Sequence, residues 1–274
     1  MKNKLKAYLA FLEQEERSLA TRKQYRHDVL DFFHFLQGAE LSKEVVVRYK
    51  AVLQQAYKPA SVNAKIAAIN GFFSYIGKGH LKVRQLKIQR QAFCPKEREL
   101  SKVEYLRLIR AAESRHNKKL SLLLQTLCGT GIRVSELCFI TAEAVRRGES
   151  TIRLKGKTRT VLIPGKLKKA LKHYLNRQGI EAGPVFITRN GRPLDRSNIW
   201  RMMKSLCADA GVQPSKVFPH NLRHLFARCF YAIDRDLAKL ADILGHSNIN
   251  TTRIYIVSSG VEHRRQMDAL GLVV

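Results

Sequence analysis

The sequence predicts a mainly α-helical protein with two domains and one small β-hairpin. Apolar residues recur at helical spacing along most of the 274 residues, which predicts helices throughout. One pair of β-branched runs interrupts this pattern and predicts the hairpin. A basic stretch with few apolar residues separates the first helices from the others, and a chain of this length has room for two domains with separate cores.

Four helices are expected before residue 77. Leucines spaced along one face define the first, and residues that favour helix starts and ends bound the other three. In chain order these residues are Leu5, Leu9 and Leu12 for the first helix, Thr21 as N-cap and Gly38 for the second, Ser42 for the third, and Pro59 and Gly77 for the fourth. We therefore expect residues 1–85 to form a small helical bundle.

Residues 86–98 are expected to link this bundle to a second domain over residues 99–274. Around this segment lysines and arginines are threaded among few apolar residues, and Pro95 interrupts any regular element. Such a segment is either a solvated linker or a basic strap that lies along a polyanion. The sequence leaves both interpretations open.

The second domain is expected to be mostly helical. Helical spacing returns at Ser101 and continues over 120–127, and β-branched runs at 151–155 and 160–163 predict two strands joined through Gly156. After this hairpin, helices are expected at 166–177, 195–210, 219–233 and 235–244, with a short terminal helix at 258–270.

A formal net charge of +28 far exceeds what folding requires and indicates a polyanionic partner. Residues 1–90 hold 17 Lys and Arg against 7 Asp and Glu, so both halves of the chain are basic. A membrane partner is not expected, because no apolar run approaches the roughly 20 residues that span a bilayer. The five cysteines are odd in number and form no Cys-x-x-Cys pair, so a cytoplasmic protein with reduced thiols and no metal site is expected.

Three short motifs and one tyrosine carry the chemical groups of most interest. They are Gly131–Leu137 with Arg133, His220–His224 with Arg223, Leu244–Ser247 with His246, and Tyr255 nine residues after His246. A phenol can attack a phosphodiester, and guanidinium groups can neutralise the phosphate where metal nucleases use carboxylates and magnesium. The chain has only 22 acidic residues and no clear carboxylate pair near these motifs, which favours metal-free breaking and rejoining of DNA.

In order and spacing these motifs resemble those of the tyrosine recombinases, the phage integrase family, and in size the chain is similar to the Xer type. Residues 18–36 also resemble the N-terminal helical, SAM-like domain of that family. The resemblance covers nearly the whole chain. It implies a core-site-binding domain over 1–85, a basic linker over 86–98 and a tyrosine-recombinase catalytic domain over 99–274.

The resemblance also implies a role for each motif residue. Tyr255 would attack the scissile phosphate and form a 3′-phosphotyrosyl link with a free 5′-hydroxyl. Arg133 and Arg223 would clamp the phosphate oxygens, and His246 would hydrogen-bond the phosphate. Because the bond energy is kept in the phosphotyrosyl link, the resemblance implies no ATP, metal or other cofactor.

Two further residues would move protons. His220 would accept or relay the tyrosine proton, and Lys155 in the hairpin would protonate the leaving 5′ oxygen. Lys157 and Arg159 lie close by, so the choice of Lys155 depends on the family pattern, which places this lysine before a glycine. The basic residues expected to contact DNA are Arg22, Lys23, Lys65, Lys157 and Arg159.

The expected partner is double-stranded DNA with short inverted-repeat core sites, bound by a tetramer on two sites, with or without a second related recombinase. The sequence does not decide between integration, excision, inversion and resolution of a mobile element or replicon. Two alternatives remain open. One is a type IB-like topoisomerase, and the other is a non-enzymatic regulator that uses residues 237–254 as a helix-turn-helix.

Each motif also has a simpler structural interpretation. Arg133 could pair with Glu136 on a helix surface. His220 and His224 have the spacing of zinc ligands, but the glutamate of the metalloprotease pattern is missing, and His224 is more typical of a buried, hydrogen-bonded residue. The occurrence of all the motifs in one basic chain favours the recombinase.

Overall fold

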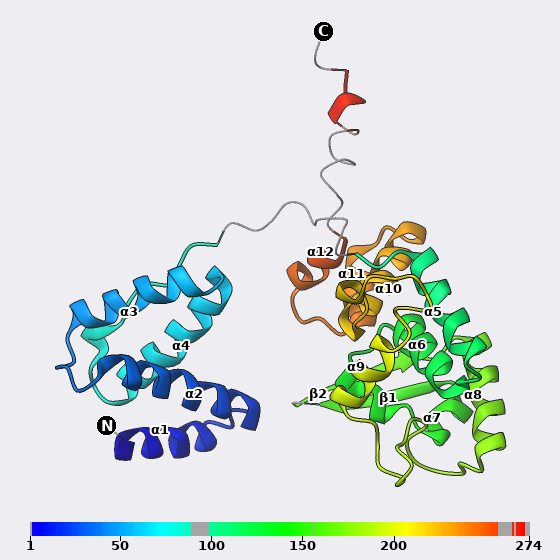
Figure 1. Cartoon of the computed structure of the whole chain (residues 1–274), viewed down its shortest axis with the longest axis horizontal. Coiled ribbons are helices and arrows are strands. Elements are labelled where there is room, and N and C mark those ends of the chain that lie inside the picture. Colours follow the sequence, from blue (N-terminus) through cyan, green and yellow to red (C-terminus); the bar gives the residue numbers. More distant parts are fainter. Residues whose placement is uncertain (1, 89–98, 155, 257–264, 266, 272–274) are drawn as a thin grey trace. The chain divides into compact units, whose positions relative to one another are not determined.

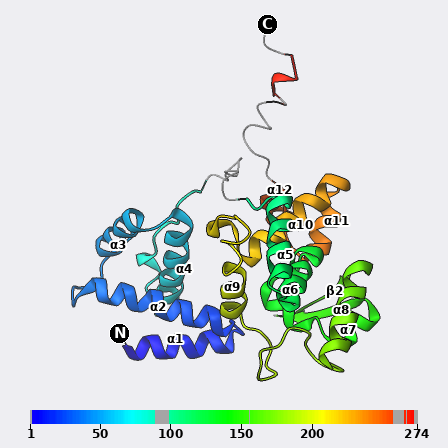
Figure 2. The ribbon, with the colours of Figure 1, turned by 45° about the vertical axis from the view of Figure 1, so that its right-hand side comes forward.

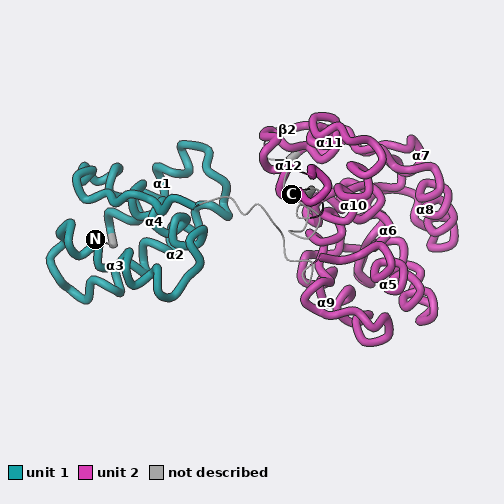
Figure 3. Tube along the Cα trace, turned by 90° about the horizontal axis from the view of Figure 1, so that it is seen from above, with its two compact units in different colours: residues 1–90 teal, residues 91–274 magenta. Residues whose placement is uncertain are grey.

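The computed structural model describes residues 2–88, 99–154, 156–256, 265 and 267–271. The chain divides into two compact units, Met1–Arg90 and Gln91–Val274, which Figure 3 colours separately. Within the described residues, the first unit is helical and the second combines helices with one two-stranded antiparallel sheet. The predicted fold class, mainly α with a small hairpin, is confirmed.

Unit 1 is a bundle around an apolar core. It contains α1 (Lys2–Gln14), α2 (Leu19–Leu36), α3 (Lys43–Ala56), α4 (Pro59–Tyr75) and the 3-10 turn η1 (Gly79–Leu81). α4 contacts each of the other three helices, and its side chains Ile66, Ile69, Phe72 and Phe73 are fully buried. Phe73 of α4 meets Phe32 of α2 edge-on, with 5.7 Å between ring centroids. The four helices expected from the sequence are therefore present.

The start of α2 differs from the prediction. Thr21 is not the N-cap, because the helix already begins at Leu19 and the Ser18 Oγ accepts the N–H of Thr21 at 3.2 Å. The Thr21 hydroxyl lies 2.8 Å from the Ser18 Oγ. Both residues are good N-caps, and apolar spacing alone does not decide which of two caps three residues apart starts the helix.

Unit 2 is built around α6 (Figures 1 and 2). Its elements are α5 (Lys102–Ser114), α6 (Lys118–Thr130), η3 (Val134–Phe139), α7 (Ala142–Arg147), β1 (Glu149–Leu154), β2 (Lys157–Leu162), α8 (Gly165–Gln178), α9 (Arg196–Lys204), η4 (Pro214–Lys216), α10 (Pro219–Ile233), α11 (Leu237–Leu244) and α12 (Ile249–Ile256). α6 contacts α5, α8, α9 and α10, so most of its apolar residues are buried. None of the described helices combines the length and apolar character that a bilayer-spanning segment needs.

The helix contacts of unit 2 bring the three sequence motifs together. α10, which carries the second motif, packs against α6, whose end opens the first. α10 also contacts α11, which ends at the third motif, and α12, which carries Tyr255. The hairpin joins this group, because the Nη1 of Arg159 on β2 donates to the carbonyl of Ile243 on α11 at 2.6 Å.

Some element boundaries differ from the sequence prediction. In the hairpin, Ile152 lies opposite Arg159, and both strands begin earlier than expected. The helix expected over 195–210 ends at Lys204, because the N–H groups of Leu206 and Cys207 bond to carbonyls three residues back instead of four. The helix expected over 258–270 lies mostly outside the described residues.

Candidate active site

Gly131 makes the turn that precedes Arg133. It ends α6 with a φ of +62°, in the left-handed region that favours glycine. A Cβ at this position would lie 2.5 Å from the Cδ1 of Phe226 on α10. The absence of a side chain therefore allows α6 and α10 to approach each other closely where the first motif leaves the core.

Glu136 on η3 is a buried carboxylate that holds two arginines. Its Oε1 accepts from the Nη1 of Arg133 at 3.0 Å, and its Oε2 accepts from the backbone N–H of Arg133 at 2.8 Å and from the Nη2 of Arg159 at 2.6 Å. Burial acts to raise the pKa of Glu136, but the hydrogen bonds and charges of the two arginines lower it overall. The Arg133 side chain remains 40% exposed, so pairing with Glu136 leaves it accessible to a phosphate.

Arg223 on α10 is almost completely buried. Its Nη1 donates to the carbonyl of Gly131 at 2.5 Å, and its Nη2 donates to the carbonyl of Leu244 at 2.7 Å and to the Nε2 of His246 at 2.8 Å. Burial and the charge of Arg133 lower the pKa of Arg223 to about 10, so the guanidinium stays charged at neutral pH. Among the described residues its Nε has no hydrogen-bond partner, which leaves a buried donor for a ligand.

His246 follows Gly245, whose φ of +66° ends α11. A Cβ at Gly245 would clash with the Cδ of Arg159. The absence of a side chain here therefore leaves room for Arg159 of β2. The His246 Nδ1 lies 2.8 Å from the Oγ1 of Thr252. Burial, followed by the charge of Arg223, lowers the pKa of His246 to about 4, so the ring is neutral at pH 7.

Tyr255 on α12 lies at the centre of this cluster and is only 6% exposed. Its ring stacks on His246 at 5.3 Å and meets His224 and His220 edge-on at 4.2 Å and 5.4 Å, measured between ring centroids. The Cζ of Arg223 lies 5.9 Å from the tyrosine ring centroid. A phenol, a buried guanidinium and three imidazoles therefore meet in one place.

His220 and His224 lie one turn apart on α10, with 4.7 Å between their ring centroids. Desolvation, followed by the positive charges of Arg223 and Arg133, lowers the pKa of His220. Burial, followed by the proximity of His220, lowers the pKa of His224 to about 3. Both rings are neutral at pH 7, and His220 is the exposed one, so it can accept a proton and exchange it with solvent.

The other predicted site residues are basic residues of the hairpin and of unit 1. Lys155 is outside the described residues, and Lys157 is the first residue of β2. In unit 1, Lys23 is exposed near the start of α2, and its neighbour Arg22 pairs with Glu13 at 2.6 Å. Of these two, Lys23 is the residue open to a phosphate.

Lys65 on α4 is buried in unit 1, whereas the sequence suggested a DNA contact. Its Nζ donates to the Oδ1 of Asp28 at 3.0 Å and to the Oδ2 of Asp31 at 2.7 Å. The ammonium is therefore occupied inside the bundle. His27 and these two aspartates have the ligand types and proximity for a metal ion, but the ammonium of Lys65 already pairs with both carboxylates.

Two contacts in the cluster were not predicted from the sequence. Arg159 was expected to contact DNA, but it is largely buried between Glu136 and the Ile243 carbonyl. Thr252 has no role predicted from the sequence, and its Oγ1 lies 2.8 Å from the Nδ1 of His246.

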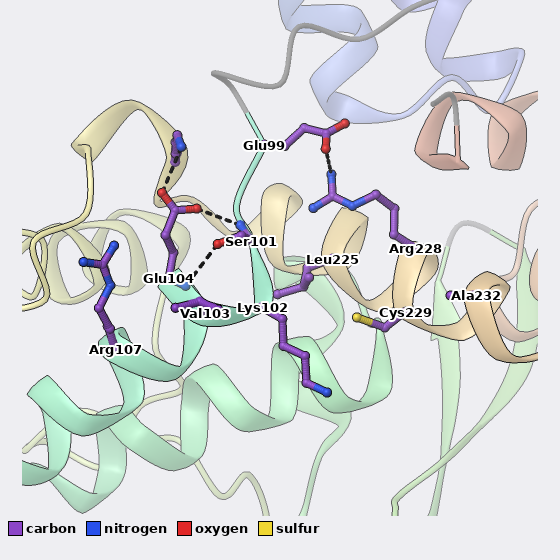
Figure 4. Close-up of a pocket in the computed structure, with 11 residues that line it drawn as sticks. Glu99, Ser101, Lys102, Val103, Glu104, Arg107, Leu225, Arg228, Cys229 and Ala232 are labelled. Carbon is purple, nitrogen blue, oxygen red and sulfur yellow. Dashed lines mark hydrogen bonds and ion pairs between the residues drawn. The ribbon is translucent and has the colours of Figure 1, made fainter. Parts of the chain in front are cut away.

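A separate groove of about 660 Å³ lies between the start of α5 and α10 (Figure 4). Arg228 pairs with Glu99 at 2.6 Å at this groove, and Glu104 pairs with Lys216 at 2.8 Å. None of the residues discussed around Tyr255 lines it. The groove is therefore separate from the cluster of the phenol, the guanidinium and the three imidazoles.

Family models match most of the chain. The model of the phage integrase family matches residues 98–260, and that of the phage integrase N-terminal SAM-like domain matches residues 5–78. Tyrosine recombinase XerA of Pyrococcus furiosus is 30% identical over 260 residues, which cover 92% of this chain and 88% of the relative. Tyrosine recombinase XerC of Thermodesulfovibrio yellowstonii is 29% identical over 88% of this chain and 87% of the relative.

Solved structures have a similar fold. A crystal structure of XerA recombinase has a TM-score of 0.56 and 27% identity, with 98% of both chains covered. A lambda integrase dimer bound to a COC′ core site has a TM-score of 0.74 and 18% identity, covering 93% of this chain and 95% of that one. XerH recombinase bound to its difH substrate has a TM-score of 0.70 and 21% identity, covering 94% and 83%.

Proposed function

This chain belongs to the phage integrase family and is a tyrosine recombinase, and on that premise we propose that Tyr255 is the nucleophile with which it cuts and rejoins DNA. The observation that carries this assignment is the position of Tyr255, whose ring contacts those of His220, His224 and His246 and lies over the guanidinium of Arg223. A tyrosine with a purely structural role in the core has no need of these neighbours. A tyrosine that attacks a phosphate needs a base and a cation.

The proposed reaction begins with attack of the Tyr255 oxygen on the scissile phosphorus. His220, neutral and exposed, accepts the phenolic proton as the new O–P bond forms. The bond to the 5′ oxygen breaks, and the leaving oxygen takes a proton from Lys155. The product is a 3′-phosphotyrosyl link, and a 5′-hydroxyl from another strand reverses the reaction to complete recombination.

Arg133 and Arg223 are proposed to stabilise the phosphate as negative charge develops on its oxygens. Fixed guanidinium groups in a site with little water are effective in this role, because they need little reorganisation during the reaction. Glu136 supports Arg133 by holding its guanidinium on one side. His246 is proposed to donate a third hydrogen bond to the phosphate from its Nε2.

Access to this site requires a local rearrangement around Arg223 and Tyr255. Arg223 is 1% exposed and Tyr255 is 6% exposed, so both are closed to a duplex in the described arrangement. Arg133, at 40% exposure, is open and is proposed to receive the phosphate first. This rearrangement exposes Arg223 and breaks its hydrogen bond to the His246 Nε2, while Thr252 keeps its place beside the His246 Nδ1.

Residues 1–85 are proposed to grip the DNA, residues 86–98 to link the two parts, and residues 99–274 to perform catalysis. Both halves are basic, and the exposed Lys23 on α2 is one proposed contact in the first. We propose short inverted-repeat core sites as the target and a tetramer on two sites as the active assembly, because a lambda integrase tetramer on a Holliday junction has the same fold. The proposed location is the cytoplasm.

Recovery of protein-linked DNA from cells that carry the native locus tests the nucleophile. Wild-type protein should leave covalent adducts that map to one short inverted repeat, and Tyr255→Phe should leave none. The matched control is Tyr231→Phe, because Tyr231 packs against the same apolar cluster and lies outside the proposed chemistry. Adducts that persist in Tyr255→Phe would overturn the assignment.

The pattern of adducts also separates the alternatives. Adducts scattered without sequence preference, together with relaxation of any supercoiled plasmid, would favour a type IB-like topoisomerase. If wild type leaves no adduct, and Tyr255→Phe gives the same footprint on DNA as wild type, a regulator that binds through residues 237–254 is favoured.

A further inference from the structure

Thr252 holds His246 from inside the helix that carries Tyr255. It is fully buried on α12, three residues before the tyrosine, and its Oγ1 lies 2.8 Å from the His246 Nδ1. The adjacent Thr251 is exposed. A buried hydroxyl beside a ring nitrogen limits which tautomer and which ring orientation His246 adopts.

The other ring nitrogen defines the tautomer. Arg223 has only donors, so its Nη2 at 2.8 Å from the His246 Nε2 makes that nitrogen an acceptor. In a neutral imidazole the proton then lies on Nδ1 and is donated to the Thr252 oxygen. The low pKa of His246, about 4, keeps the ring neutral at pH 7.

A phosphate requires the opposite arrangement. Its non-bridging oxygens only accept, so a neutral His246 can bond a phosphate only with a proton on Nε2. The ring reaches this tautomer when Nδ1 loses its proton to water and Nε2 takes one from water, which leaves the total number of protons unchanged. Nδ1 then becomes an acceptor and needs a donor.

We propose that Thr252 is a positioning residue for His246, and that its hydroxyl changes from acceptor to donor when the His246 Nε2 passes from Arg223 to the scissile phosphate. A hydroxyl can make this change by rotation of one O–H bond, without displacing a heavy atom. This inference rests on the proposed function. It adds that α12 carries both the nucleophile and the group that prepares the histidine.

Three variants test the inference. Thr252→Val keeps the shape and removes the hydroxyl, Thr252→Ser keeps the hydroxyl, and Thr251→Val removes the exposed hydroxyl next to it. Loss of a hydrogen bond to a buried group should lower the yield of protein-linked DNA in Thr252→Val by about 10-fold or more. Thr252→Ser should stay within about 3-fold of wild type, and Thr251→Val should match wild type.

A second readout does not depend on DNA. In the purified full-length chain labelled with 15N-histidine, the Nδ1–H of His246 should give a slowly exchanging, hydrogen-bonded proton signal, assigned by its loss in His246→Asn. The signal should persist in Thr252→Ser and Thr251→Val and disappear in Thr252→Val. A purely packing role for Thr252 would leave the signal unchanged in Thr252→Val.

The outcomes separate this inference from the proposed function. If wild type forms adducts and Thr252→Val forms as many, the inference is wrong and the proposed function stands. If Thr252→Ser fails as badly as Thr252→Val, the defect does not follow the hydroxyl and the inference is again wrong. If wild type forms no adduct at all, the proposed function fails and the role of Thr252 at a phosphate fails with it.

Discussion

Arg159 on β2 and Glu136 on η3 form an ion pair with 2.6 Å between Nη2 and Oε2, and this pair connects the hairpin to the first catalytic motif. The carboxylate is 4% exposed and the guanidinium 14%, so water screens their attraction little. Arg159 also donates to the carbonyl of Ile243, just before the third motif. One side chain therefore fixes the relative positions of three parts of the site.

We expect Arg159→Met to destabilise unit 2 by about 3 kcal/mol, because it leaves a buried carboxylate with one guanidinium fewer. Urea denaturation of the purified chain measures this change. In the double variant with Glu136→Gln, the loss should be smaller than the sum of the two single losses. Arg153→Met, an exposed arginine on β1 of the same hairpin, should cost little.

The same variant distinguishes an internal ion pair from a DNA contact. If Arg159 bound a phosphate, Arg159→Met would reduce the slope of log affinity against log salt by about 0.9. We expect an unchanged slope for Arg159→Met, measured at a salt concentration and temperature where the variant is folded. A reduced slope would restore Arg159 to the DNA interface.

Gly131→Ala should destabilise the fold and slow cleavage. An alanine at a φ of +62° costs about 1–2 kcal/mol, and its Cβ would lie 2.5 Å from the Phe226 ring. We therefore expect a loss of at least about 2 kcal/mol in the free energy of unfolding. Gly129→Ala is a matched control inside α6, where the nearest atom to the new Cβ is the Leu167 Cδ2 at 3.9 Å.

The control should change stability in the opposite direction. Gly129 lies within a helix, where alanine is favoured over glycine by about 1 kcal/mol, so Gly129→Ala should be neutral or stabilising. Thermal unfolding of the two variants, side by side, measures the contrast. Equal effects would mean that the left-handed turn and the Phe226 contact do not define the Gly131 site.

The helices, the hairpin and the motif residues could be predicted from the sequence because each has a local signal. Tyr255, Arg133, Arg223 and His246 were found through motif order, and the fold brings all four into one cluster. The burial of Lys65 had no such signal, because its aspartate partners lie on another helix, more than 30 residues away in the chain.

The Arg159–Glu136 pair could not be predicted for the same reason. Its residues are 23 positions apart, on a strand and a 3-10 helix whose contact depends on the packing of unit 2. From sequence alone, a lysine or arginine in a basic chain is predicted to be exposed and to contact DNA, because its buried partner is not known. The role of Thr252 could not be predicted, because a threonine near the start of a helix is common. Its partner, His246, is brought to it only by the fold.

Stability should fall as the pH falls from 7 to 5. The pKa of His224 is about 3 and that of His246 about 4 in the folded chain, whereas both titrate near 6.5 when unfolded. Above pH 6.5 each is neutral in both states and contributes nothing. Below pH 6.5 only the unfolded chain binds the protons, so the free energy of unfolding decreases by up to about 1.4 kcal/mol per pH unit for each histidine.

Urea denaturation at pH 7.5, 6 and 5 measures this dependence. In His224→Gln the contribution of this ring disappears, so the slope against pH should be shallower, whatever the stability at pH 7.5. His173→Gln, an exposed histidine on α8, should keep the wild-type slope. An unchanged slope in His224→Gln would show that this ring titrates normally in the folded chain.

Lys155 is the proposed acid for the leaving 5′ oxygen, and it lies outside the described residues. It follows Leu154, which pairs with Lys157 across the hairpin, and the hairpin is held to the site by Arg159. Lys155→Ala should lower cleavage by about 10²–10⁴, the range for loss of a general acid. A substrate with sulfur in place of the bridging 5′ oxygen should restore the rate, because a thiolate leaves without a proton. Lys157→Ala is the matched control, and rescue by sulfur in that variant instead would move the role of acid to Lys157.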